Sequence, residues 1–438
     1  MVDHREESSS GRHGLLTRPV KVPRWVAALV ILLIVALFFV AGSLLQGRSA
    51  RVGPMELVSF RDLLPSIAGV TQGRIVDGNS VEIIQDAEFF DRLIADIDAA
   101  TETVHFETFV WWRGRVCRRL ADAFVRAADR GVTVRVLLDA WGTRRMAEDL
   151  RGSMEEAGVS VLAYHPIRPG TIGVLNNRDH RKLAIVDGRI GYAFGHGTAE
   201  EWDRDGGSDP WQDTAVRVEG PLVTSLQTAF LDNWIPVSRE VPTGKAVFPE
   251  LEPMGSVRGH VVMSSGAGPF SLVKVLYKLA IASAQEEILI QTPYFVPDSA
   301  VVELLVAAVD RGVRVRLMVP GPEVIDSRLV CHASHTRYDD LLEGGIEILE
   351  YRPSLLHKKI VVVDQIWSHV GSTNFDSRSL EINDEVSVGL IDRGVAAVLI
   401  REFERDARRS RRLDPRTWRP SWAHRLLDAS AATLQEQL

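Results

Sequence analysis

The chain has 438 residues, enough for two ordinary domains or for one large duplicated body. Apolar residues make up 45% of it, a normal share for a globular core, which excludes an intrinsically disordered protein. The formal charge is −7, from 51 basic and 58 acidic residues, so the composition shows no sign of a basic, nucleic-acid-binding surface. Two cysteines, Cys117 and Cys331, are too few for a disulfide framework and match no zinc spacing.

An uncharged apolar stretch lies near the N-terminus. Residues 25–46 read WVAALVILLIVALFFVAGSLLQ, long enough to cross about 30 Å of hydrocarbon. The apolar region of a cleaved signal peptide has only about 7–15 residues, although Ala-Gly-Ser at 41–43 leaves cleavage open as an alternative. More basic residues precede the stretch than follow it closely, which favours a cytoplasmic N-terminus. We expect a single-pass protein of the cell membrane, with a tail (1–24), a transmembrane helix (25–46) and a linker (47–75).

The remainder of the chain repeats itself. Residues 129–137, DRGVTVRVL, match residues 310–318, DRGVRVRLM, almost position for position. Residues 156–164, EAGVSVLAY, match residues 343–351, EGGIEILEY, in the same order. The chain therefore contains two related halves.

Each half alternates helical and extended patterns. The first half predicts helices over 89–100 and 117–130, strands over 103–110, 132–138 and 160–164, and another helix between the last two strands. Such alternation is typical of an α/β fold. We expect two tandem repeats, each a mixed β-sheet flanked by helices, forming one pseudo-twofold body. Their boundaries are 76–237 for the first repeat, 238–258 for a Pro- and Gly-containing connector, 259–413 for the second repeat and 414–438 for a C-terminal tail.

Both halves contain the pattern His-x-Lys-x4-Asp. Strand side chains alternate, so the His and the Lys point to one face at the end of an apolar strand. One such pair would normally be a solvated strand end, but two in matched register indicate a function. Related by a pseudo-twofold axis, the two pairs would meet in one pocket. The motif residues are His180, Lys182 and Asp187 in the first half, and His357, Lys359 and Asp364 in the second.

Two histidines and two lysines suit phosphoryl chemistry. The lysines would hold the nonbridging oxygens of a phosphate. One histidine could attack phosphorus, and the other could protonate the leaving oxygen and later deprotonate the acceptor. We find no carboxylate cluster and no Cys/His set with metal spacing in the sequence, so we expect neither a metal nor a cofactor in the reaction.

The doubled motif resembles the HxKxxxxD signature of the phospholipase D superfamily. Residues 371–374, GSTN, resemble the GSxN element of that superfamily, and the similarity spans roughly residues 75–413. Within the superfamily, residues 106–110 (FETFV), 291–297 (QTPYFVP) and 374–378 (NFDSR) resemble phrases of the bacterial cardiolipin synthases. The resemblance implies a phospholipase D-like fold and metal-free transfer of a phosphatidyl group.

The first motif departs from this pattern. The second half has Ser372 and Asn374 as expected phosphate-supporting residues, whereas the first half has no Asn at the matching place. There we expect Gly197 or Thr198 to contact phosphate through a backbone N–H or a hydroxyl. We interpret His196, in the same segment, as a residue at the rim of the pocket and not as a third catalytic histidine.

Four acids complete the expected site. The resemblance implies that an acid on a neighbouring strand, Asp213 or Glu385, orients each catalytic imidazole through Nδ1; ordinary strand-end charges are the alternative. Asp187 and Asp364 belong to the motifs, but we expect them to act structurally, by capping the turn after the motif strand.

The resemblance implies a cardiolipin synthase-like phosphatidyltransferase that uses phosphatidylglycerol, with His180 as nucleophile and His357 as general acid and base. A phospholipase D hydrolase that forms phosphatidic acid is the alternative, and a nuclease is a weaker one. A membrane-anchored binding protein without catalysis is the third hypothesis. The expected partners are an anionic phospholipid and the membrane, and not a nucleic acid.

Overall fold

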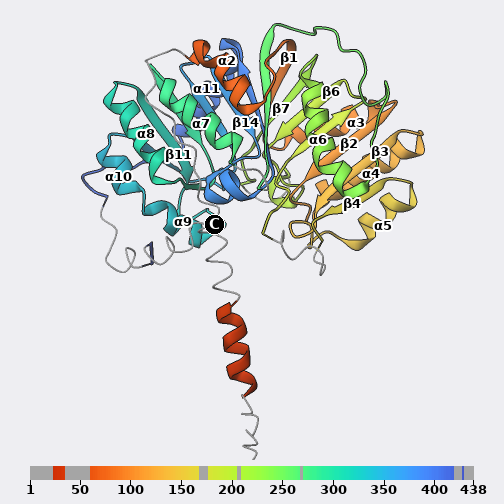
Figure 1. The fold of residues 1–438 in the computed structure, drawn as a ribbon, viewed down its shortest axis with the longest axis horizontal. Coiled ribbons are helices and arrows are strands. Elements are labelled where there is room, and N and C mark those ends of the chain that lie inside the picture. The colour runs from red at the N-terminus through yellow and green to blue at the C-terminus, as the bar shows by residue number, and fades with distance from the viewer. Residues whose placement is uncertain are drawn as a thin grey trace, which may run out of the picture. The chain divides into compact units, whose positions relative to one another are not determined.

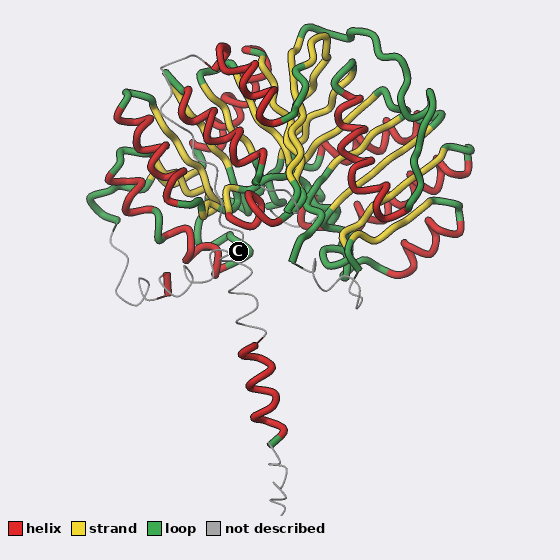
Figure 2. The backbone as a smooth tube through the Cα atoms, in the orientation of Figure 1, coloured by secondary structure: helices red, strands yellow, loops and turns green. Residues whose placement is uncertain are grey.

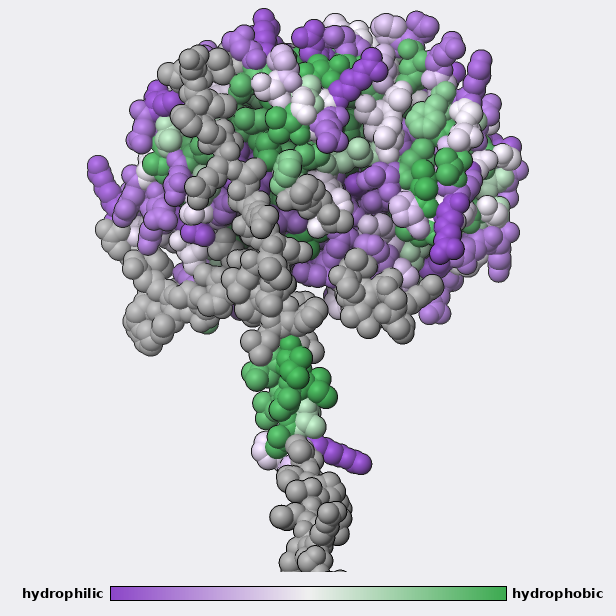
Figure 3. Space-filling model, viewed as in Figure 1, coloured by the Kyte–Doolittle hydropathy of each residue, from purple (hydrophilic) through white to green (hydrophobic). Residues whose placement is uncertain are grey.

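The computed structural model describes residues 23–34, 60–166, 176–204, 209–266, 270–418 and 427–428. The chain divides into two units, Met1–Arg48 and Ser49–Leu438. In the first unit, residues 24–34 form a helix whose side chains are apolar after Arg24 (Figure 3). No helix within the described ranges has the length and apolar character needed to cross a membrane. Residues 35–46, the rest of the expected transmembrane segment, lie outside the described residues.

One continuous mixed sheet of fifteen strands, counted over the described residues, runs through the second unit (Figure 1). From one edge to the centre, the first repeat contributes β4 (Ser160–Tyr164), β3 (Thr133–Asp139), β2 (Thr103–Thr108), β5 (Leu183–Val186), β6 (Ile190–Phe194), β7 (Thr214–Glu219) and β1 (Val76–Gln85). From the centre to the other edge, the second repeat contributes β8 (Val257–Ser264), β16 (Glu385–Ile391), β14 (Trp367–Gly371), β13 (Ile360–Val363), β9 (Glu287–Gln291), β11 (Arg314–Pro320), β12 (Glu347–Tyr351) and β17 (Ser410–Arg412).

The two repeats use their strands in the same order. In each, three parallel strands lie toward the edge, and antiparallel strands follow toward the centre. The central strands β1 and β8 pair antiparallel, with Val76 opposite Gly259 and Asn79 opposite Val257. The expected pseudo-twofold arrangement is therefore present. The expectation of one sheet in each half was incomplete, because the edges of the two half-sheets pair and make a single sheet.

Helices cover the sheet, as the tube in Figure 2 shows. The first repeat has α3 (Glu88–Ala99), α4 (Arg115–Asp129), α5 (Glu148–Glu156) and α6 (Val223–Ser238), preceded by α2 (Phe60–Thr71). The second has α7 (Leu272–Ser283), α8 (Ser299–Asp310), α9 (Arg328–His335), α10 (Tyr338–Glu343) and α11 (Arg393–Ala407), together with the short parallel pair β10 (Phe295–Val296) and β15 (Phe375–Asp376).

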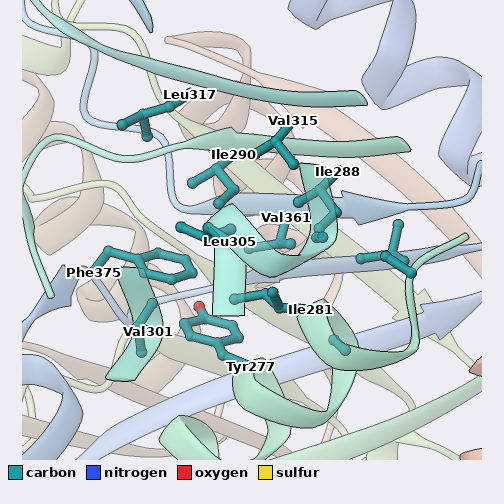
Figure 4. Close-up of a cluster of buried hydrophobic side chains, with 14 of the residues drawn as sticks. Tyr277, Ile281, Ile288, Ile290, Val301, Leu305, Val315, Leu317, Val361 and Phe375 are labelled. Atoms are coloured by element: carbon teal, nitrogen blue, oxygen red, sulfur yellow. The ribbon is translucent and has the colours of Figure 1, made fainter. Parts of the chain in front are cut away.

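The buried apolar residues show why these segments form these elements. In α4, Val116, Leu120 and Phe124 recur at helical spacing and are fully buried. Arg119 is half-buried and Arg126 exposed, and both pair with acids of α3. In the second repeat, alternate residues of β9 and β11 pack against α7 and α8 (Figure 4). A third cluster contains residues of α6 and α11 and of strands from both repeats, so the two repeats share one core.

The predicted elements are present, with shifted ends. The helix expected over 89–100 is α3, and the strand expected over 160–164 is β4. The strand expected over 103–110 ends at Thr108, because the chain then leaves the sheet and Trp111 forms a bridge with Thr198. Described residues 239–256 lie between α6 and β8 without a helix or strand, and the last two residues of the expected connector belong to β8.

Candidate active site

Each motif begins in a segment that precedes a strand near the middle of its half-sheet. His180 lies before β5 and His357 lies before β13. The backbone N–H of His180 donates to the carbonyl oxygen of Asp384 (2.9 Å), and that of His357 donates to the carbonyl oxygen of Gln212 (2.8 Å). Both bonds join one repeat to the other. The segments that carry the motifs therefore cross between the repeats before they enter the sheet.

The crossing places each imidazole against an acid of the other repeat. Nδ1 of His180 lies 2.8 Å from Oε1 of Glu385, the first residue of β16. Nδ1 of His357 lies 2.7 Å from Oδ2 of Asp213, just before β7. A carboxylate acceptor fixes the proton on Nδ1 and leaves Nε2 as a lone pair. Both acids predicted from the sequence are thus in contact with imidazoles, each with the histidine of the other half.

The two lysines lie in the same site. Lys182 donates to the carbonyl oxygen of His180 (3.0 Å), and Lys359 donates to that of His357 (2.5 Å) and lies 3.0 Å from its Nε2. Each lysine also lies near enough to the histidine of the other repeat to lower the pKa of that histidine. The four motif side chains therefore form one electrostatic group.

Burial and the lysine charges keep both imidazoles neutral. Burial, followed by Lys182 and Lys359, holds the pKa of His180 well below its usual range. Burial and Lys359 lower the pKa of His357 to about 4. Both histidines are 8% exposed, so neither is completely enclosed by the protein. A neutral imidazole is the form that can act as a nucleophile.

The two acids differ in charge state. Burial raises the pKa of Glu385 to about 7, against the opposing charge of Lys182. Burial would also raise the pKa of Asp213, but Lys359 and His357 outweigh it and hold that pKa below its usual range. His357 therefore has an ionised partner, which favours an imidazolium at that position once an anion has bound. The two histidine–acid pairs thus have the same geometry, but their acids differ in pKa.

The motif aspartates lie away from this group. Asp187 accepts backbone N–H bonds from Glu102 (2.8 Å) and Thr103 (3.0 Å) at the start of β2. Asp364 accepts the matching bonds from Glu286 (2.8 Å) and Glu287 (3.1 Å) at the start of β9. The expectation of a structural role agrees with these contacts. The partners lie in the loop before the neighbouring strand, whereas the sequence suggested the turn after the motif strand.

Trp202 lies against Gly197, the residue that matches Asn374 of the second repeat. Its Nε1 donates to Oδ2 of Asp213 (3.0 Å), the oxygen that also contacts His357. A Cβ on Gly197, the position that matches Asn374, would lie 2.7 Å from the indole ring of Trp202. A Cβ on Gly195 would lie 2.0 Å from Oδ1 of Asp213. The small residues of the first motif therefore make room for an indole donor and its acid.

One expectation for the first motif is narrowed by these contacts and another, the place of His196, is corrected. Thr198 is buried, and its backbone N–H donates to the carbonyl oxygen of Val110 (2.9 Å), so that N–H is not available to a phosphate. His196 does not lie at a rim: it is fully buried, stacks on Phe89 at 4.5 Å, and its Nε2 lies 2.8 Å from the carbonyl oxygen of Asp86. The loop carries His196 into the core behind Asp213.

The second repeat supports its acid differently. The Ser372 hydroxyl donates to Oε2 of Glu385, and it also accepts the backbone N–H of Val386 (3.1 Å). Asn374 is buried, and its Oδ1 has no hydrogen-bond partner among the described residues. The GSTN element of the second repeat thus supports the acid that holds His180, the histidine of the first repeat.

Further aromatic and basic residues around the imidazoles were missed from the sequence. Phe109 lies against His180 (5.1 Å between ring centroids), and Trp202 and Trp211 lie against His357 (5.1 and 6.2 Å). Arg378 adds a third positive charge near His180. Phe109 belongs to the phrase 106–110 and Arg378 to the phrase 374–378, whereas Trp202 and Trp211 belong to none of the quoted phrases. Strand periodicity gives no sign of which of these residues reach the site.

Replacing Trp202 with Phe should raise the pKa of His357. The variant keeps an aromatic ring beside the imidazole but removes the N–H that shares the charge of Asp213, so the carboxylate becomes a stronger partner for an imidazolium. Titration of the histidine ring by NMR measures the effect. Trp211→Phe is the matched control, since Trp211 also lies beside His357. An unchanged His357 titration in Trp202→Phe would contradict this role of the indole.

Comparison with known proteins agrees with this site. Residues 93–216 and 277–407 match the family described as cardiolipin synthase, PLD-like domain. The chain is 32% identical over 375 residues to the major cardiolipin synthase of Bacillus subtilis, covering 83% of this chain and 76% of that protein. It is 33% identical to a cardiolipin synthase of Oceanobacillus iheyensis (84% and 77%) and 32% identical to cardiolipin synthase A of Pseudomonas putida (77% and 70%).

Solved structures support the fold. The phosphatidylserine synthase of Haemophilus influenzae superposes with a TM-score of 0.69 at 15% identity, covering 86% of this chain and all of that one. The polyphosphate kinase of Porphyromonas gingivalis gives a TM-score of 0.52 at 15% identity, covering 89% of this chain and 57% of that one. Together with the matched residues and the doubled motif, these similarities show that the chain belongs to the cardiolipin synthase family of the phospholipase D superfamily.

Proposed function

We propose that the protein joins two molecules of phosphatidylglycerol into cardiolipin and releases glycerol, through a phosphohistidine intermediate. The crossed pairing of the two imidazoles carries the proposal: His180 with Glu385 and His357 with Asp213 (2.8 and 2.7 Å). One phosphate can then be served by two histidines from different repeats. Membership of the cardiolipin synthase family supplies the substrate class.

In the first half-reaction, His180 is the nucleophile. Its Nε2 attacks the phosphorus of phosphatidylglycerol, and the bond from phosphorus to the glycerol oxygen breaks. His357 donates a proton to that oxygen, so glycerol leaves as a neutral alcohol. The negative phosphate and the ionised Asp213 together favour the protonated form of His357 that this step needs. Lys182 and Lys359 stabilise the charge on the nonbridging oxygens.

In the second half-reaction, His357 acts as a base. It takes the proton from a hydroxyl of a second phosphatidylglycerol, whose oxygen attacks the phosphorus and breaks the bond to Nε2 of His180. Cardiolipin forms, and the imidazole of His180 is released neutral. If water took the place of the alcohol, the same intermediate would give phosphatidic acid, the product of the hydrolase alternative. The formal charge of −7 disfavours the nuclease alternative.

We place the reaction at the cell membrane, with a single N-terminal span and the N-terminus in the cytoplasm. The support is the uncharged run over residues 25–46 and the larger number of basic residues before it. Sequencing the N-terminus of the protein from membranes tests this placement, which predicts retention of the run. A mature terminus close to residue 44 would contradict it.

The products of phosphatidylglycerol identify the acceptor. Purified protein incubated with phosphatidylglycerol vesicles should give cardiolipin and glycerol in equal amounts, measured by mass spectrometry. Phosphatidic acid and glycerol without cardiolipin would identify a hydrolase. The Lys182→Ala, Lys359→Ala variant is the control for contaminating lipases, because it lacks the lysines proposed to hold the phosphate.

Substitution of the histidines should separate their roles. His357→Ala should lower the rate of glycerol release by about 10²–10⁴-fold, the usual contribution of a general acid. It should lower the rate of release of an acidic phenol much less, because that leaving group needs little protonation. It should also accumulate a phosphatidyl group on His180. His180→Ala should be inactive with both leaving groups, because no covalent intermediate forms. A phosphatidyl group mapped to His357 in the His180→Ala variant would reverse the assignment.

The lysines should set the alkaline limit of activity. Burial lowers the pKa of Lys359 to about 7 and that of Lys182 to about 8. Both must carry charge to hold the phosphate, so kcat/KM should fall as the pH rises through these values, since this ratio reports the free enzyme. Lys359→Arg, whose side chain stays charged, should extend this limb to higher pH even though it lowers the maximum. An unchanged limb would exclude Lys359 as its cause.

A further inference from the structure

A group of metal-ligating side chains lies outside the catalytic set. His332 and His335 are three residues apart on α9 and so lie on one helix face. The carboxylate of Asp428 approaches the same face, with its Oδ1 2.7 Å from Nδ1 of His332. One ligand atom from each of the three residues lies within 4.8 Å of the others. Asp428 is 5% exposed, so its charge is buried beside the two imidazoles.

These donors fit one cation of the zinc class. Imidazole nitrogen and carboxylate oxygen are usual zinc ligands, with bonds of about 2.0–2.2 Å. Ligand atoms of one tetrahedral zinc are therefore about 3.3 Å apart, so small side-chain rotations bring this group to that spacing. Nδ1 of His332 could bind the metal after its proton moves to Nε2, without a change in net protonation. Three protein ligands leave a fourth position for water.

A cavity beside the group provides room for that water. It has a volume of about 540 Å³ and includes His332 and His335 in its lining. Arg328, Arg411 and Arg412 also line it, and Arg411 pairs with Glu350. The positive charges of these arginines repel a metal cation. Binding must therefore come from bonds to the three ligand atoms and not from the electrostatic potential of the cavity.

We propose that His332, His335 and Asp428 bind one zinc-class cation that fastens the segment at residues 427–428 to α9. α9 packs through Val330 and Ala333 on Val296 of β10. β10 in turn pairs with β15, which directly follows Asn374. The cation would thus stabilise the packing of α9 on β10 and β15, next to the second GSxN element. The reaction proposed above proceeds without it.

Zinc binding by the full-length protein, without an affinity tag and stripped with a chelator, tests the site. Calorimetric titration with zinc sulfate should give one site per chain, and the melting temperature should rise with zinc concentration, because the cation binds the folded state. His332→Ala and Asp428→Asn should each weaken binding at least about tenfold. Asp414→Asn is the matched control, since Asp414 lines the same cavity but is not one of the three ligands.

Two further measurements keep the test decisive. Cobalt(II) titrated into the unaltered protein should give the intense visible absorption bands of a four-coordinate site. This measurement does not depend on whether any variant folds. His357→Ala should bind zinc as the unaltered protein does, because the catalytic imidazoles are not the ligands. No zinc binding, binding unaffected by Asp428→Asn, or binding lost in His357→Ala would each overturn the proposal. None of these results concerns the phosphatidyl transfer, which is measured separately.

Discussion

The structure of the site depends on an exchange of hydrogen bonds between the two repeats. Each catalytic-motif histidine is held at Nδ1 by the acid of the other repeat, at 2.8 Å for His180 and 2.7 Å for His357. The same exchange occurs in the backbone, where each histidine N–H donates to a carbonyl oxygen just before the opposite acid. Neither repeat alone can orient its own imidazole. The two repeats are held together by the shared core of α6 and α11 and by the central β1–β8 pair. These contacts are therefore needed to form the site as well as the fold.

A duplicated architecture normally produces two equal half-sites, but the proposed reaction needs two histidines with different roles. The difference arises in the residues around the acids. Ser372 supports Glu385, whose pKa burial raises to about 7, whereas Trp202 supports Asp213, whose pKa lies below its usual range next to Lys359. An ionised acid stabilises an imidazolium better than a partly protonated one does. The unequal environments thus agree with a proton-transferring His357 and a nucleophilic His180.

The sequence predicted the local features well and the contacts between repeats poorly. Matched motifs, helix periodicity and strand alternation depend on neighbouring residues, and these identified the repeats, the elements and the four motif side chains. The crossed pairing could not be predicted, because spacing along the chain does not say which of two equivalent acids a histidine meets. The role of Trp202 was missed for a related reason. Its ring lies where a Cβ on Gly197 would clash with it, and a glycine in the sequence does not show which side chain will pack against it. His196 was misplaced because a loop can turn into the core as easily as toward a rim.

A crystal structure with orthovanadate tests the shared site most directly, since vanadate takes the geometry of phosphoryl transfer. One vanadate should lie between the repeats, in contact with Nε2 of both His180 and His357 and with Nζ of Lys182 and Lys359. Nδ1 of each histidine should remain on the acid of the other repeat. Two separate vanadates, or a histidine paired with the acid of its own repeat, would contradict a single site built by exchange.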